Sequence, residues 1–128
     1  MAARVPRVVG RRYRLLNTTK QTELASHLTT AATPWVRMKG LLGRSSLPEG
    51  EGLFFPGCRS IHTYGMQFPI DVIFVDRELA VVLVRPCLTS GRLAMAWCAW
   101  GVVELPSGTI GRSQTTVADR LQLECTEG

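Results

Sequence analysis

Three ionisable side chains, His62, Asp71 and Glu104, lie in otherwise apolar stretches of the sequence. An imidazole beside two carboxylates can accept and donate protons near neutral pH, and Arg37 or Arg44 could hold the carboxylates in ion pairs. A buried carboxylate needs such partners, because desolvating a lone charge is costly. The same residues could instead form a structural hydrogen-bond network that fixes turns. The sequence leaves both interpretations open.

A second pattern is the spacing of Cys58, His62 and Met66, which lie four residues apart. These side-chain types ligate copper in electron-transfer proteins, but such sites need a second histidine, and His27 is the only other one. A small apolar cysteine, a strand histidine and a core methionine account for the spacing as well. We therefore predict neither a metal nor another cofactor.

Two tryptophans, Trp97 and Trp100, with Arg85 and Arg92 nearby, offer stacking and positive charge of the kind that binds single-stranded nucleic acid. Residues three apart in a strand face opposite sides, so we expect one ring in the core and one at its rim, and no nucleic-acid binding. The sequence contains no GxSxG, phosphate-loop or HExxH motif, which removes the common hydrolase and nucleotide signatures.

The apolar, β-branched run Ile70 to Val75, interrupted only by Asp71, predicts a strand buried on both faces. Residues 76–79 predict a hairpin turn into a return strand. Residues 23–28 fit a strand or a helical turn, residues 86–97 a connection, and residues 109–119 an irregular or briefly helical segment. The full set of predicted strands is 12–17, 52–55, 60–64, 70–75, 80–85, 98–105 and 121–125.

One helix is predicted from Pro34 to about Leu42, because Thr33 can cap it, Pro34 suits its first position and Gly43 can end it. About six or seven short strands with one packed helix, and no alternation of strands and helices, indicate an α+β, β-rich fold. We expect a mostly antiparallel small barrel or sandwich.

The 128 residues carry 15 basic and 10 acidic side chains, a net charge of +5, and many of the arginines lie within residues 4–14. Residues 1–11 are predicted to be a flexible basic tail, residues 12–125 a single domain, and residues 126–128 a second tail. No stretch is apolar enough to span a membrane, and no secretory signal is expected. A cytoplasmic protein with four reduced cysteines is the simplest expectation.

Three motifs occur in order: TPWVRMKGLLGR, then IHTYGMQFPIDVIFVD, then VVELPSGTI. Together they resemble the domain of unknown function 192 family over roughly residues 12–124. The resemblance implies a compact β-rich domain with one helix on its sheet, and no established catalytic residue. Some members carry an export signal or lipid anchor, and neither is expected for this chain. The family often has a Gly-Asp turn before its last strand, where this sequence has Ala118 and Asp119, and alanine resists positive φ.

These observations favour a non-catalytic binding module that holds a small ligand or a protein segment; the alternative is a small enzyme that uses His62, Asp71 and Glu104. We expect Asp71 to accept hydrogen bonds from the backbone of the turn at residues 65–69 or from Arg37 or Arg44, and we expect the exposed Asp76 to tolerate substitution unless it caps its turn. The partner and the oligomeric state are not predicted. The candidate pocket or polar cluster comprises Arg37, Arg44, His62, Thr63, Met66, Asp71 and Glu104.

Overall fold

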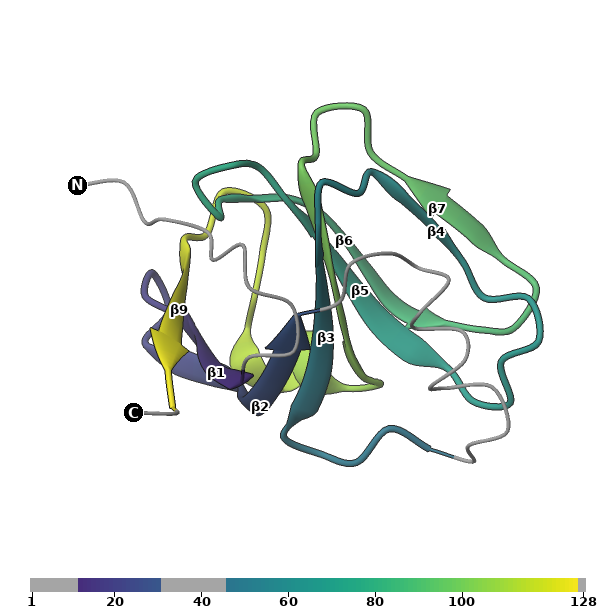
Figure 1. Cartoon of the computed structure of the whole chain (residues 1–128), viewed down its shortest axis with the longest axis horizontal. Helices are drawn as coiled ribbons and strands as arrows, with labels where there is room; N and C mark the ends of the chain where they lie inside the picture. Colours follow the sequence, from purple (N-terminus) through teal and green to yellow (C-terminus); the bar gives the residue numbers. More distant parts are fainter. Residues whose placement is uncertain (1–11, 31–45, 127–128) are drawn as a thin grey trace.

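The structure is a computed structural model, and it describes residues 12–30 and 46–126. Figure 1 shows the elements of this part of the chain, all of them strands apart from one short helix. The strands are β1 (Arg12–Asn17), β2 (Thr22–Thr30), β3 (Glu51–Pro56), β4 (Ser60–His62), β5 (Ile70–Val75), β6 (Val81–Leu88), β7 (Leu93–Met95), β8 (Gly101–Pro106) and β9 (Leu121–Cys125), and the helix is α2 (Thr109–Ser113).

Seven strands form one sheet in the order β6-β5-β8-β3-β2-β1-β9, while β4 and β7 pair as a separate two-stranded ribbon. Each pair is antiparallel except β2 with β3, which is parallel. Residues 31–50 separate these two strands, and a parallel pair requires a crossover connection of about a dozen residues or more. The predicted β-rich, mostly antiparallel fold is confirmed, with this one exception.

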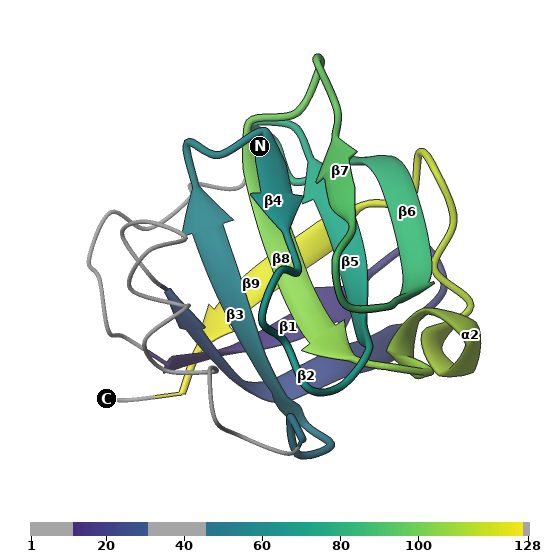
Figure 2. The same cartoon turned by 90° about the vertical axis from the view of Figure 1, so that its right-hand side faces the viewer.

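The sheet curls until its two edge strands approach each other, which gives the barrel-like outline in Figure 2. The Val81 N–H of β6 donates to the carbonyl of Asp119 at 2.9 Å, and the Leu121 N–H of β9 donates to the carbonyl of Leu79 at 2.9 Å. Pairing of edge backbone groups satisfies donors and acceptors that would otherwise be exposed at a sheet edge.

Buried side chains lie on both faces of the central strands. One cluster, which includes Phe54 and Ile73, fills the inside of the curled sheet, and another, which includes Phe55 and Phe74, lies between the sheet and the β4–β7 ribbon. Every residue of β5 is buried, which confirms the predicted strand that is buried on both faces.

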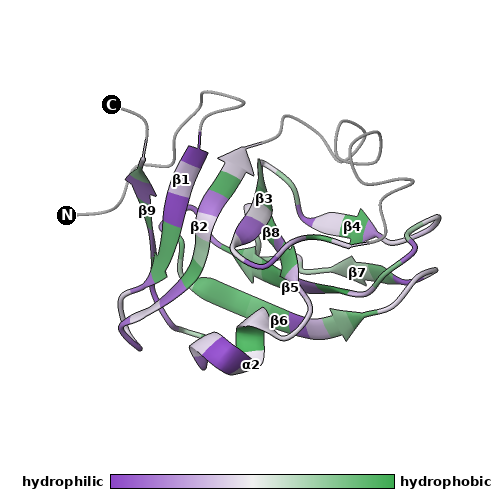
Figure 3. Cartoon of the chain, turned by 90° about the horizontal axis from the view of Figure 1, so that it is seen from below, coloured by the Kyte–Doolittle hydropathy of each residue, from purple (hydrophilic) through white to green (hydrophobic). Residues whose placement is uncertain are grey.

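The helix α2 follows Gly108, whose φ of 98° suits glycine, and ends at Gln114 with φ 59°. It lies beside β2 and β6, below the sheet in the view of Figure 3. No helix of the described residues is long and apolar enough to cross a membrane. The helix predicted over residues 34–42, with Gly43, lies outside the described residues.

Several predicted boundaries match the structure: β1, β5 and β9 have the expected limits, and residues 23–28 belong to a strand. Two predictions were wrong, and the strand expected over 60–64 ends at His62. Residues 86–97 were expected to be a connection but contain the end of β6 and all of β7, because a three-residue strand is too short to show periodicity. The strand expected over 98–105 begins only at Gly101, after a turn.

Candidate functional site

Asp71 is 1% exposed, and both of its carboxylate oxygens accept backbone hydrogen bonds. Oδ1 accepts from the Cys87 N–H at 2.8 Å, and Oδ2 accepts from the Ile110 N–H at 2.7 Å. Cys87 lies in an irregularity of β6 with φ 51°, where the register to β5 shifts. The carboxylate therefore accepts from an N–H in the β6 irregularity and from one in the first turn of α2. The expected donors were the backbone of the turn at residues 65–69 or the guanidinium of Arg37 or Arg44.

The register of the sheet separates Asp71 from Glu104. Asp71 pairs with Leu105, and Val72 pairs with Glu104, so the two carboxylates lie on opposite faces of neighbouring strands. Asp71 faces the inside of the curled sheet, and Glu104, which is also buried, faces the side of the ribbon. The structure does not bring these two predicted site residues into one cluster.

Thr63 is fully buried and holds the connection that precedes β7. Its hydroxyl donates to the carbonyl of Thr89 at 2.6 Å and accepts from the Arg92 N–H at 2.9 Å. Met66 packs in the core beneath the ribbon. Both residues thus hold the base of the ribbon, which explains their place in the motif without a ligand.

His62 is the last residue of β4. Because side chains alternate along a strand, it lies on the outer face of the ribbon, opposite to the buried Ile61. Its ring stacks on Tyr64, with the ring centroids 5.2 Å apart and the planes at 29°. His62 therefore lies on a different side of the sheet from Asp71. The predicted site residues Arg37 and Arg44 lie outside the described residues.

No group of three or more histidine, cysteine, aspartate or glutamate side chains within residues 12–30 and 46–126 is placed to hold a metal ion. The four cysteines all lie in these ranges, and none of them is in a disulfide.

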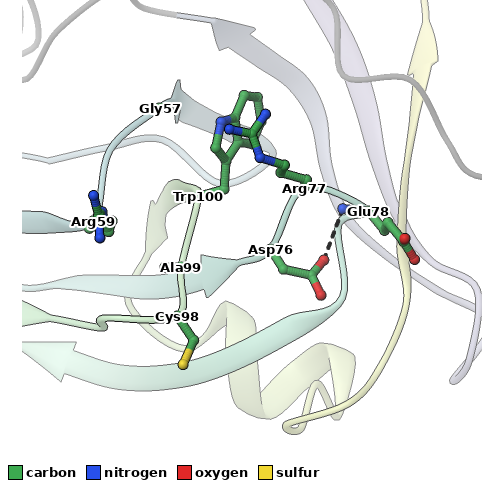
Figure 4. A pocket seen from close by; sticks show the side chains of 8 residues that line it. All are labelled: Gly57, Arg59, Asp76, Arg77, Glu78, Cys98, Ala99 and Trp100. Carbon is green, nitrogen blue, oxygen red and sulfur yellow. Dashed lines mark hydrogen bonds between the residues drawn. The ribbon is translucent and has the colours of Figure 1, made fainter.

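An open cleft of about 600 Å³ lies at one end of the three central strands, and Figure 4 shows the side chains around it. Pro56 of β3 and Val75 of β5 both pair with Gly101, the first residue of β8, so the loops that flank these positions meet there. The residues that line the cleft come from these three loops: Gly57, Arg59, Asp76, Arg77, Glu78, Cys98, Ala99 and Trp100.

Hydrogen bonds of Asp76 and contacts of the Trp100 ring shape the cleft. Asp76 Oδ1 accepts hydrogen bonds from the Glu78 and Ala80 N–H groups, each at 2.9 Å, and so caps the β5–β6 turn. The guanidinium of Arg77 lies 5.5 Å from the centroid of the Trp100 ring, which packs edge-on against Phe54. Asp76 thus caps its turn, which is the stated exception to its expected tolerance of substitution.

Sequence reasoning missed most of this cleft, because arginine, glutamate and cysteine in loops are ordinary surface residues. Only the antiparallel pairing of β3, β8 and β5 brings residues 57–59, 76–78 and 98–100 to the same edge, and no local sequence pattern shows that pairing. Loops carried on a rigid sheet are frequent binding sites.

A second polar cluster, around Asp119, is buried and consists of hydrogen bonds between protein groups. Asp119 Oδ2 accepts from Asn17 at 2.9 Å, from Lys20 Nζ at 2.8 Å and from the Thr116 N–H at 3.0 Å. Burial opposes ionisation of this carboxyl, but the hydrogen bonds from Asn17, Lys20 and Thr116 outweigh it and lower the pKa of Asp119 to about 2. The cluster holds chain segments together rather than forming a site.

Comparison with known proteins identifies the family of this chain. Two solved structures share the fold: a Sinorhizobium meliloti 1021 protein provisionally described as a transcription regulator (20% identity, TM-score 0.75, covering 92% of this chain and 98% of that one) and a protein of unknown function from Novosphingobium aromaticivorans DSM 12444 (21% identity, TM-score 0.72, covering 95% and 93%). No curated protein matches this chain. The family model DUF192, described as Uncharacterized ACR, matches residues 15–123, and the chain therefore belongs to the domain of unknown function 192 family.

Proposed function

We propose that the domain is a binding module and that the cleft beside Trp100 holds a small ligand with a negatively charged group. The observation that carries this proposal is the position of Arg77. Its guanidinium carbon lies over the Trp100 ring, 5.5 Å from the ring centroid, and the side chain makes no hydrogen bond or ion pair with a described residue. Its N–H donors can therefore bind a carboxylate or a phosphate.

The other charges in the cleft refine the ligand class. Arg59 adds a second cation across the cleft from Arg77 (Figure 4). Asp76 uses Oδ1 for its turn, and its Oδ2 makes no hydrogen bond with a described residue. A molecule with one anionic group and one hydrogen-bond donor, such as an amino acid or the carboxyl end of a peptide, matches this arrangement. The volume of about 600 Å³ is within the usual range for small-molecule sites.

The alternative is a small enzyme that uses His62, Asp71 and Glu104. Such an enzyme needs these groups to converge on one substrate within hydrogen-bond reach. The register places Asp71 and Glu104 on opposite faces of the sheet, and both are buried. This arrangement supports the binding module in preference to the enzyme.

The proposal can be tested by thermal unfolding in the presence of inorganic phosphate, acetate, free amino acids and a short peptide with a free carboxyl end, at constant ionic strength. A ligand that binds only the native state raises the melting temperature as its concentration increases. We expect a rise for wild-type protein and none for Arg77→Gln. The control Arg85→Gln removes an exposed arginine of β6 outside the cleft and should keep the rise.

A rise that survives in Arg77→Gln, or a flat response to the whole panel, would contradict the proposal. The panel should include a DNA duplex, because one structurally similar protein is described as a transcription regulator. If only the duplex raises the melting temperature, the ligand of the cleft is the phosphate backbone of a nucleic acid and not a small molecule.

A further inference from the structure

The exposed apolar side chains of the described residues gather on the β4–β7 ribbon. We call Tyr64, Leu93, Met95 and Trp97 the ribbon face; their exposed fractions are 57%, 63%, 44% and 77%. Only one other large apolar side chain in the described ranges, Val117, is comparably exposed. An exposed apolar group of this kind usually marks an interaction surface.

The strand register explains why Leu93 and Met95 share one face. Met95 pairs with Ser60, and Leu93 pairs with His62, so these two apolar side chains point away from the buried Ala94 and the core. Trp97 lies in the turn that follows β7, and Tyr64 lies in the turn that follows β4. The stacking of Tyr64 on the His62 ring fixes that tyrosine beside the same face. A groove would cover part of each side chain that lines it, so fractions this high indicate side chains that protrude.

The charged side chains of the ribbon and its connections are all positive, whereas Asp76 and Glu78 line the cleft that Arg59 borders. Arg59 lies at one end, where its carbonyl accepts the Ala96 N–H at 3.0 Å, and Arg92 lies at the other, where its N–H donates to Thr63. Both arginines are exposed. Residues 57–70 and 80–103, which include the ribbon and its connections, contain no aspartate or glutamate.

We propose that the ribbon face docks on an anionic lipid membrane surface. Tryptophan and tyrosine favour the region between headgroups and acyl chains, and protruding leucine and methionine side chains gain from leaving water there. Arg59 and Arg92 would contact acidic headgroups on either side of the inserted residues. Nucleic acid would use the rings and the arginines but would leave Leu93 and Met95 without a partner of matching chemistry. The surface borders the cleft and shares Arg59 with it, but Leu93, Met95 and Trp97 do not line the cleft, and the membrane proposal does not require a ligand there.

Co-sedimentation of the full chain with phosphatidylcholine vesicles, with and without about one-third phosphatidylserine, tests this surface. We expect binding only to the anionic vesicles. The double variant Leu93→Ser/Trp97→Ser should reduce the partition coefficient by about tenfold or more, since two apolar side chains no longer enter the interface. The matched control Val117→Ser removes an apolar side chain of similar exposure in the turn before β9 and should bind as wild type does. Arg92→Gln should weaken binding and lessen its dependence on salt.

Quenching of Trp97 fluorescence by brominated lipids provides a second measurement that does not rely on a loss of binding. Quenching should be clear in wild-type protein and should fall in Trp97→Phe. The proposal is overturned if the protein does not bind vesicles at low salt. It is also overturned if the Leu93→Ser/Trp97→Ser variant binds as wild type does, because the contact would then lie elsewhere, such as at the arginines of residues 4–14. It is equally overturned if the ribbon-face variant loses binding to a single-stranded oligonucleotide while no vesicle binding occurs.

Discussion

Ala118 adopts a backbone conformation that alanine rarely takes, with φ 79°. The turn around it leads into β9, and the Ala118 N–H donates to the carbonyl of Val81 at 2.8 Å. An L-residue with a Cβ atom is disfavoured by about 1–2 kcal/mol in the left-handed region. The resemblance to a family that often has glycine here pointed to this residue, and the structure shows that the glycine-like conformation is kept although the glycine is not.

We predict that Ala118→Gly stabilises the protein by about 1 kcal/mol, because the strain of the left-handed alanine is removed and outweighs the added chain freedom of glycine. Urea unfolding at neutral pH measures the change. The control Ala80→Gly, at a position without positive φ, should destabilise by about 0.5–1 kcal/mol. A loss of stability in Ala118→Gly would show that the turn relaxes to another conformation in solution.

At the scale of elements, Asp71 joins β5, β6 and α2 through two backbone hydrogen bonds. Pro86 has no N–H, and the Cys87 N–H is turned out of the β5–β6 ladder by the irregularity, so the carboxylate replaces a strand partner there. The same side chain satisfies one of the donors that every helix leaves at its start. This role explains why a carboxylate interrupts the most apolar strand of the chain.

Asp71→Asn should therefore lower the free energy of unfolding by about 1.5–3 kcal/mol. The amide has one acceptor oxygen for two backbone N–H groups, so its NH₂ group would face the other N–H donor in the core. Asp76→Asn should cost less than about 1 kcal/mol, since Oδ1 alone accepts both turn hydrogen bonds and an amide oxygen can do the same. Urea unfolding of the two variants at neutral pH gives the comparison. Equal effects would mean that Asp71 is solvated in solution.

The strands were the most predictable part of the molecule, because β1, β5 and β9 each have a clear pattern of apolar residues between turns. Pairing was less predictable: the parallel β2–β3 pair and the Asp71 contacts join segments far apart in sequence, and no local pattern encodes them. The cleft was the least predictable, since Arg59, Arg77 and Trp100 become neighbours only through the pairing of three strands.

For the whole molecule, the Asp119 cluster helps to hold the curled sheet closed. The Asp119 carbonyl accepts from Val81 of β6, while its carboxylate accepts from Asn17 of β1 and Lys20 of the following turn. One residue thus connects both edges of the sheet with its first hairpin. The folded protein lowers the pKa of this carboxyl to about 2, against 3.8 ordinarily, so the ionised form of Asp119 stabilises the closed sheet.

A folded pKa below the unfolded one means that ionised Asp119 stabilises the native state above about pH 4, and that this contribution is lost as the pH falls towards 2. The difference in unfolding free energy between wild type and Asp119→Asn should be constant near neutral pH and should shrink across that interval. Urea unfolding at a series of pH values measures it. A difference that is independent of pH down to 2 would show that Asp119 has no depressed pKa.

The pairing of β9 with β1 also has a consequence during synthesis. Arg14 and Glu124, an ion pair between these strands at 3.2 Å, are separated by 110 residues along the chain. As the polypeptide emerges from the ribosome, the edge of β1 that pairs with β9 stays unpaired until almost the entire domain has been translated. Contacts of such long sequence separation slow folding, and an open edge during that delay favours association with other nascent chains. Loss of the final strand would leave that edge permanently exposed.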